Sequence, residues 1–132
     1  MSLESPLGKS LGRGSANDGT GHWWAQKLTA VALIPLTLWL VISILGMDSF
    51  AYLPVRAWIG SPLNSILLIL LTISALYHSE LGLQVVVEDY VHGSAKVVTL
   101  VLFKLAHVAL AVAAVYAILI ISLGSLSPGA SA

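Results

Sequence analysis

The segment from Val97 to Leu123, "VVTLVLFKLAHVALAVAAVYAILIISL", decides the fold class because it is almost entirely apolar over a length that can cross a membrane. A helix rises about 1.5 Å per residue, so about 20 apolar residues cross a bilayer core of about 30 Å. Two further apolar segments, 28–46 and 63–87, have comparable lengths. The sequence therefore predicts three membrane-spanning helices.

The composition of the whole chain leads to the same class. The 132 residues are 58% hydrophobic and only 9% charged, whereas a soluble domain carries about 25% charged residues. We therefore predict an all-α integral membrane protein. The chain has no cysteine, which excludes disulfides, thiolate metal sites and iron–sulfur ligation by this chain. The formal net charge is zero, and we expect no nucleic-acid partner.

The pattern of polar and apolar segments predicts one transmembrane domain with a tail at each end. We expect a flexible cytoplasmic tail over 1–21, a three-helix transmembrane domain over 22–124, and a short outer tail over 125–132. The predicted helices run over about 24–47, 62–89 and 95–124. Loops are expected over 50–62 on the outer side and over 88–96 on the inner side.

The second span carries polar groups that a bilayer-spanning segment usually lacks, in "YHSELGLQVVVEDYV" over 77–91. His78 and Asp89 are eleven residues apart. In a helix this spacing returns to within about 20° of the same face and advances about 16 Å, so we expect both to face one cleft. Gly82, one turn from His78, leaves room for a large planar group. Spacing alone favours a hydrogen-bonded histidine and leaves a haem ligand as the less frequent alternative.

The end of this span and the third span carry further polar residues. Asp89 and Tyr90 can be a solvated helix end, but an acid there opposes the helix dipole and favours a compensating charge or ligand. Lys104 and His107 lie three residues apart on one helix face. Lys104 can reach back to the interface, and His107 is expected to be a neutral imidazole hydrogen-bonded to a neighbouring helix. A haem bridging His78 and His107 is also geometrically conceivable.

Two stretches resemble the small hydrophobic anchor subunit of succinate dehydrogenase, which passes electrons from succinate to ubiquinone. They are "HWWAQKLTAVALIPL" over 22–36 and "HSELGLQVVVEDYV" over 78–91, where a histidine is followed by an Asp-Tyr pair. The resemblance covers nearly the whole chain from His22 onward. It implies that the three helices form part of a haem-binding helical bundle with a partner anchor subunit.

The resemblance also implies roles for individual residues. His78 would be an axial ligand of the haem b iron, and Tyr90 would donate a hydrogen bond to ubiquinone. Asp89 would shape the quinone site and its proton supply. Lys27 matches a position often occupied by arginine near the haem propionates, where lysine offers a point charge instead of a planar fork. Lys27 can equally reach lipid phosphates.

The family supplies the rest of the site from other chains. The implied partners are a second cytochrome b anchor subunit, an iron–sulfur subunit and a flavoprotein subunit, together with membrane lipids of the bacterial cell inner membrane. The chain would not be catalytic alone. Two alternatives remain open: a fumarate reductase anchor that works in the opposite direction, and a structural or proton-transport subunit without haem.

We predict a cytoplasmic N-terminus and a periplasmic C-terminus, because basic residues are retained on the cytoplasmic side of a membrane. Of the basic residues near the spans, only Arg56 falls on the predicted outer side; the others are Lys9, Arg13, Lys27 and Lys96. Reporter domains fused to each end, assayed for cytoplasmic or periplasmic activity, measure this directly. An N-terminal reporter active outside the cytoplasm would contradict the predicted orientation.

Overall fold

The computed structural model describes residues 16–126, and all regular elements in this range are helices. They are α2 (Ala16–Leu45), α3 (Tyr52–Gly60), α4 (Pro62–Tyr90) and α5 (Ser94–Leu126). Three helices are long and apolar enough to cross a membrane, over Thr20–Leu45, Pro62–Tyr90 and Ser94–Gly124. This confirms the predicted all-α membrane fold. Most of the two predicted tails, residues 1–15 of the tail over 1–21 and residues 127–132 of the tail over 125–132, lies outside the described residues.

The first helix begins earlier than the sequence analysis predicted. It starts at Ala16 instead of residue 24, so residues 16–21 of the predicted flexible tail are helical. The segment contains no proline, and each residue added to an existing helix gains a backbone hydrogen bond at little further cost. The apolar span therefore extends its helix into a polar sequence.

Most of the connection predicted over 50–62 folds as the short helix α3, and its outer location stays a prediction. Ser61 ends α3 and also precedes α4, with an extended backbone at φ −69° and ψ 136°. A residue before proline is pushed into this conformation, and Pro62 is suited to the first position of α4. One residue therefore separates the two helices and sets a sharp turn between them.

Side chains from the first turn of α4 bind the last turn of α3. Ser65 is buried, and its hydroxyl donates to the carbonyl of Ile59 at 2.6 Å. The Asn64 amide donates to the carbonyl of Trp58 at 2.9 Å. Carbonyls in the last turn of a helix lack partners within the helix, so Ser65 satisfies the Ile59 carbonyl. Asn64 adds a second donor to the Trp58 carbonyl, which also accepts from the Ser61 N–H at 3.4 Å. The Trp58 ring also stacks on Trp39 of α2, with centroids 5.7 Å apart.

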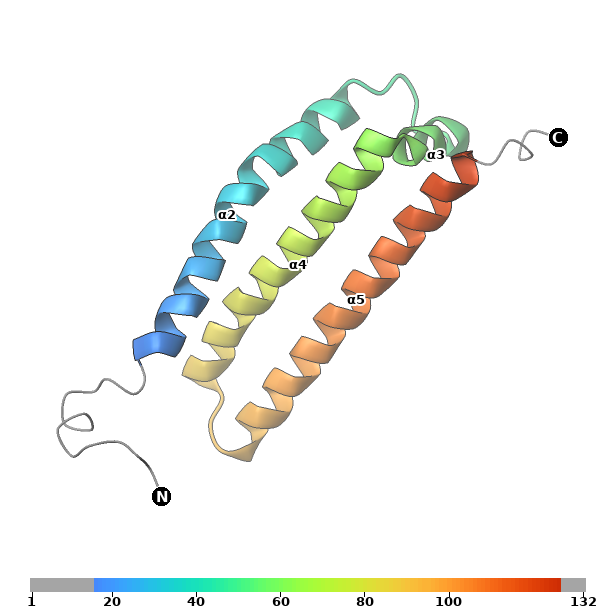
Figure 1. Cartoon of the computed structure of the whole chain (residues 1–132). Coiled ribbons are helices and arrows are strands. Elements are labelled where there is room, and N and C mark those ends of the chain that lie inside the picture. The colour runs from blue at the N-terminus through green and yellow to red at the C-terminus, as the bar shows by residue number, and fades with distance from the viewer. Residues whose placement is uncertain (1–15, 127–132) are drawn as a thin grey trace.

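The three long helices lie side by side, with α4 in the middle (Figure 1). In the described chain α4 packs closely against both α2 and α5, whose backbones do not approach each other as closely. The start of α2 and the α4–α5 turn lie at one end of the bundle, here called the turn end. The short helix α3 and the last turns of α5 lie at the other end, here called the α3 end.

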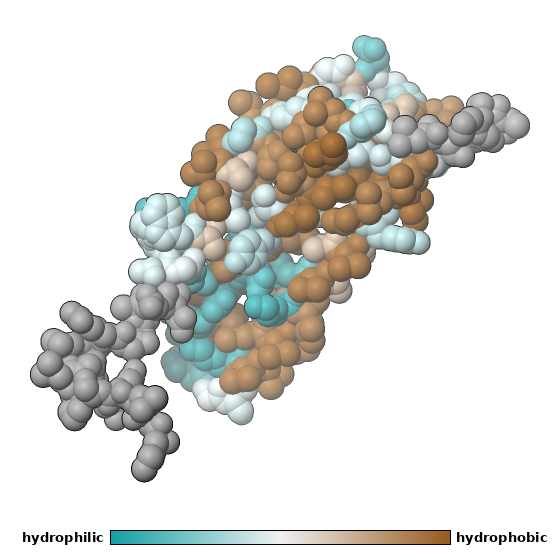
Figure 2. Space-filling view, in the orientation of Figure 1, coloured by the Kyte–Doolittle hydropathy of each residue, from teal (hydrophilic) through white to brown (hydrophobic). Residues whose placement is uncertain are grey.

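Few side chains are buried inside this bundle. Among the described hydrophobic residues only Leu81 and Val87, both on α4, are buried, and hydrophobic residues cover most of the face seen in Figure 2. A hydrophilic patch interrupts this surface toward the turn end (Figure 2). An apolar surface of this extent is suited to contact with lipid or with other membrane helices. Because both buried hydrophobic residues lie on α4, the other helices pack around α4.

Candidate functional site

His78 lies in the interface between α4 and α2, where it contacts two polar residues of α2. The Nδ1 atom of the half-buried His78 is 3.0 Å from Oγ1 of Thr29. Its Nε2 atom is 3.5 Å from Nε2 of Gln26. Gln26 and Thr29 are three residues apart and therefore share one face of α2. The imidazole is thus held inside the bundle by contacts on both ring nitrogens.

The space beside His78 is shaped by Gly82 and filled in part by Gln26. A Cβ atom placed on Gly82 would meet the Gln26 amide nitrogen at 3.8 Å. The Gln26 Oε1 atom and the nearby Nε2 atom of His22 are buried without a hydrogen-bond partner among the described residues. A buried polar atom left unpaired costs about 1–3 kcal/mol, so such atoms point to contacts completed by a group outside this chain.

The donor set around His78 fits a haem and does not fit a bare metal ion. Among the described residues, no group of three or more His, Cys, Asp or Glu side chains could hold a metal ion. Haem iron needs only axial ligands from the protein, and one of them can come from another chain. A single histidine with a glycine one turn away is sufficient for half of such a site.

The predicted site residues at the turn end are exposed. Asp89 and Tyr90 form the last turn of α4, and the exposed fraction of Tyr90 is 80%. Neither residue lines the α4–α5 cavity described below, and a cleft shared by Asp89 and His78 stays a prediction. The ammonium of Lys96 donates to the backbone carbonyl of Glu88 at 3.4 Å. A cation therefore compensates the negative end of α4, as the acids there led us to expect.

Lys27 contacts an aromatic ring in this structure. Its ammonium lies 3.7 Å from the centre of the Trp23 ring, a cation–π arrangement. Trp23 in turn packs edge to face with Trp24, with ring centroids 5.4 Å apart. These contacts agree with an interfacial anchor at the start of α2, and the contact of Lys27 with a propionate stays a prediction.

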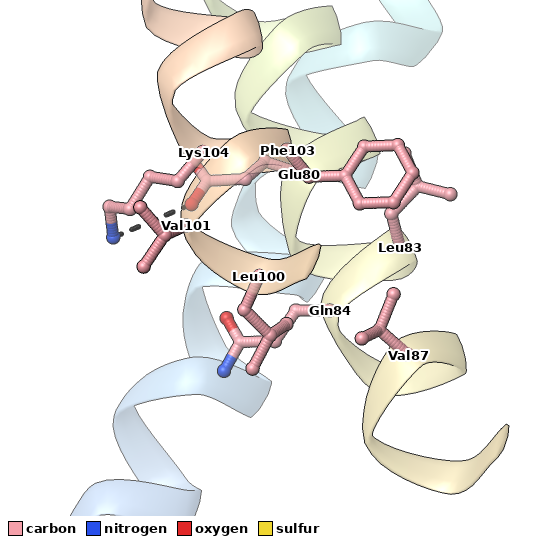
Figure 3. A pocket seen from close by; sticks show the side chains of 8 residues that line it. All are labelled: Glu80, Leu83, Gln84, Val87, Leu100, Val101, Phe103 and Lys104. Atoms are coloured by element: carbon pink, nitrogen blue, oxygen red, sulfur yellow. Dashed lines mark ion pairs between the residues drawn. The ribbon is translucent and has the colours of Figure 1, made fainter. Parts of the chain in front are cut away.

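A second polar cluster lies on the other side of α4, against α5. The Lys104 ammonium lies 3.4 Å from Oε1 of Glu80 and forms an ion pair with it. The exposed side-chain fractions are 70% for Lys104 and 15% for Glu80. The pair lines a cavity of about 190 Å³ between the two helices (Figure 3). The remaining lining residues are mostly apolar: Leu83, Gln84, Val87, Leu100, Val101 and Phe103.

The sequence analysis missed the pairing of Glu80 with Lys104, although a signal for it exists. Each residue lies ten positions from the turn that joins α4 to α5, which begins after Tyr90 and ends before Ser94. Equal spacing from a helical hairpin places two residues at the same depth. An acid and a base at matched depth on adjacent spans are therefore expected to pair.

His107 is directed toward α4, as the sequence analysis expected. Its Nδ1 donates to the backbone carbonyl of Phe103 at 2.8 Å, and its Nε2 lies 3.4 Å from the Ser79 hydroxyl. His78 instead contacts α2. The two histidines therefore occupy different helix interfaces, and this structure does not bring them together around one ligand.

A membrane subunit of three spans, with a half-buried histidine between two of them, is the class that this fold and site define. The chain matches the family described as succinate dehydrogenase/fumarate reductase transmembrane subunit over residues 1–120, and it belongs to this family.

Relatives in this family are named as hydrophobic membrane anchor subunits of succinate dehydrogenase. The protein of Rickettsia bellii (strain RML369-C) is 38% identical over 84 residues, which cover 63% of this chain and 66% of the relative. That of Rickettsia conorii (strain ATCC VR-613 / Malish 7) is 30% identical over 90 residues, 67% of this chain and 71% of the relative. The match to the Paracoccus denitrificans protein is 29% identical over 126 residues, 96% of this chain and 98% of the relative.

The pairing of Glu80 and Lys104 predicts an asymmetric effect of removing each charge. Lys104→Leu leaves the less exposed Glu80 carboxylate unpaired and should lower the free energy of unfolding by about 1–3 kcal/mol. The double variant Glu80→Leu/Lys104→Leu should regain most of this loss, because no charge is left unpaired. Thermal unfolding of the purified membrane complex measures the effect.

Lys96→Leu is the comparison, since Lys96 is half-buried and its ammonium contacts a backbone carbonyl, that of Glu88, with no carboxylate partner among the described residues. It removes one contact at a helix end and leaves no carboxylate of low exposure unpaired, so it should lower the free energy of unfolding by less than about 1 kcal/mol. A double variant as unstable as Lys104→Leu would show that the ion pair is not what Lys104 contributes.

Proposed function

We propose that this chain is the membrane anchor of a succinate dehydrogenase. It attaches the flavoprotein and iron–sulfur subunits to the membrane, shares a haem b with a second anchor subunit, and helps form the site where ubiquinone is reduced. The observation that carries the proposal is His78, a half-buried imidazole within a membrane span, with Gly82 one turn away, in a chain of this family. Ionisable residues inside membrane spans are usually functional.

A partner in the membrane is supported by the polar and apolar surfaces of the chain. The unpaired buried atoms of His22 and Gln26 and the largely exposed apolar helices are what one half of an interface presents. The second haem ligand then comes from the partner anchor subunit, because His107 is directed to Ser79. Haem b, when bound, supplies a one-electron carrier at this interface.

The proposal that a quinone binds at the turn end rests on Tyr90 and Asp89, which are both exposed there. The Tyr90 hydroxyl donates a hydrogen bond to a quinone carbonyl as negative charge develops on its oxygen. Asp89, with water at the membrane surface, passes protons to the reduced quinone. Exposed side chains at this end are available to the soluble subunits, which complete the pocket. In this proposal the turn end faces the bacterial cytoplasm across the inner membrane.

Lys27 contributes a positive charge at the same end of the bundle. It follows Gln26, whose amide contacts His78, so it lies close along the chain to the proposed haem site. An ammonium there forms an ion pair with a propionate as a point charge. When this ion pair forms, the Lys27 ammonium either leaves the Trp23 ring or keeps its cation–π contact beside the propionate.

A fumarate reductase anchor is the second candidate, because the matching family includes both enzymes. The relatives described above are named for succinate dehydrogenase, which favours the succinate-oxidising direction. The two enzymes use the same anchor chemistry in opposite directions. The ratio of succinate oxidation to fumarate reduction by the purified complex separates them.

Tyr90→Phe should keep the complex assembled and lower its quinone reductase rate. The ring remains and only the hydroxyl donor is lost, and a hydrogen bond to a charged group is worth about 10- to 100-fold in rate. Succinate oxidation with a soluble artificial acceptor should continue at the normal rate. Tyr116→Phe, an exposed tyrosine on α5, is the control and should leave both rates unchanged. Unaltered quinone reduction in Tyr90→Phe would rule out this role.

His78→Leu should abolish the six-coordinate low-spin haem of the complex, because leucine cannot ligate iron. His107→Leu is the matched control, since it removes a histidine from the other helix interface, and its haem should stay low-spin. Optical and electron paramagnetic resonance spectra of the purified complex measure both. A normal low-spin spectrum without His78 would contradict the proposed ligand and reopen the alternative of a subunit without haem.

A further inference from the structure

We propose that Thr29 is a positioning residue for His78. Its hydroxyl oxygen accepts the Nδ1–H of the imidazole and so keeps the lone pair of Nε2 available to ligate iron. The inference rests on the proposed function of His78 as a haem ligand and adds to it a residue of a different helix. It depends on three contacts at Thr29 and one at Gln26.

The direction of each hydrogen bond at Thr29 follows from its acceptors. Oγ1 lies 2.8 Å from the carbonyl oxygen of Ala25 and 3.1 Å from that of Gln26. A carbonyl cannot donate, so the single hydroxyl hydrogen is directed toward these two oxygens. If it were directed at His78 instead, two oxygens bearing lone pairs would face each other at 2.8 Å without a hydrogen between them. The hydroxyl oxygen is therefore the acceptor toward His78.

This assignment fixes the tautomer of the imidazole. Nδ1 of His78 lies 3.0 Å from Thr29 Oγ1 and must supply the hydrogen of that bond. A neutral imidazole carries one hydrogen on its two nitrogens, so Nε2 keeps its lone pair. Histidines that ligate metals usually donate their second ring nitrogen to a fixed acceptor in this way, which holds the ring and raises its basicity.

The contact on the other ring nitrogen agrees with the same tautomer. The Gln26 amide nitrogen, 3.5 Å from His78 Nε2, can only donate, so Nε2 must be the acceptor. At 3.5 Å this contact is at the long limit of a hydrogen bond. The oxygen of the same amide is buried without a partner among the described residues. Gln26 is thus weakly held where it touches Nε2, whereas Thr29 is firmly bonded.

The helix offers a matched control for the backbone bonds of Thr29. Thr37, also on α2, donates to the carbonyls of Leu33 at 2.6 Å and Ile34 at 3.1 Å. It is exposed, and its hydroxyl contacts no histidine. Both threonines bond back to the residues three and four positions earlier, a habit of threonine in helices. Replacing each by valine keeps the shape and removes the same backbone bonds, so only the contact with His78 differs.

The test compares the complete complex carrying Thr29→Val, Thr29→Ser or Thr37→Val. Thr29→Val removes the acceptor, so the imidazole becomes a weaker donor to ferric iron. We expect a positive shift of the haem midpoint potential, altered g-values of the low-spin signal, and haem retention weakened about 10- to 100-fold. Thr29→Ser keeps the hydroxyl, and Thr37→Val leaves His78 untouched. Both should match the unaltered complex in all three measurements.

Thr29→Cys extends the test if the valine variant does not assemble. Sulfur is a weaker acceptor than oxygen, so the cysteine variant should shift the potential in the same direction by a smaller amount. Normal potential, g-values and haem retention in Thr29→Val, or in Thr29→Cys where valine is not tolerated, would overturn the role of Thr29.

The His78→Leu variant separates this inference from the proposed function. If His78→Leu loses the low-spin haem while the Thr29 variants behave normally, the ligand is right and the positioning residue is wrong. If His78→Leu keeps a normal low-spin haem, the proposed ligand fails and the role of Thr29 fails with it.

Discussion

The absence of water in the bilayer core is the constraint on which this structure depends. Backbone groups must be satisfied within each span, so the chain crosses as helices, and polar side chains must find partners on neighbouring helices. Three consecutive residues near the middle of α4 meet this requirement in different directions. His78 contacts Thr29 of α2, Ser79 contacts His107 of α5, and Glu80 pairs with Lys104. Because α4 packs against both other long helices, these contacts also define how the three helices are arranged.

The number and type of the long helices could be predicted from apolar length alone, because length is a property of one segment at a time. The early start at Ala16 and the helix at Tyr52–Gly60 could not, since helix extension and a helix at the end of the bundle depend on neighbouring structure more than on hydropathy. His78 was found from its position in a span and from resemblance. Thr29 was not, because periodicity gives the face of each helix but does not give the rotation of one helix against another.

In the proposed function only part of the site belongs to this chain, and this is why the sequence could not complete it. The residues that face His78 come from α2, whereas Asp89 and Tyr90 end in exposed positions. In the proposed complex, the exposed Tyr90 at a helix end and the unpaired buried amide oxygen of Gln26 would each be one side of an interface with another subunit. Distances between His78 and the groups of other subunits are set by how those subunits pack, and no pattern within 132 residues encodes them.

The single residue between α3 and α4 has a consequence for how the chain responds to membrane thickness. Ser65 and Asn64 bind the last turn of α3 to the first turn of α4, so the two helices move as one bent body. The α4 span, joined to α3 in this way, cannot slide freely along its own axis, because α3 would have to leave the end of the bundle. In a thicker or thinner bilayer, tilting is then easier than sliding, which is a common response to hydrophobic mismatch. The depth of His78, measured along α4 from α3, is preserved in membranes of different lipid composition.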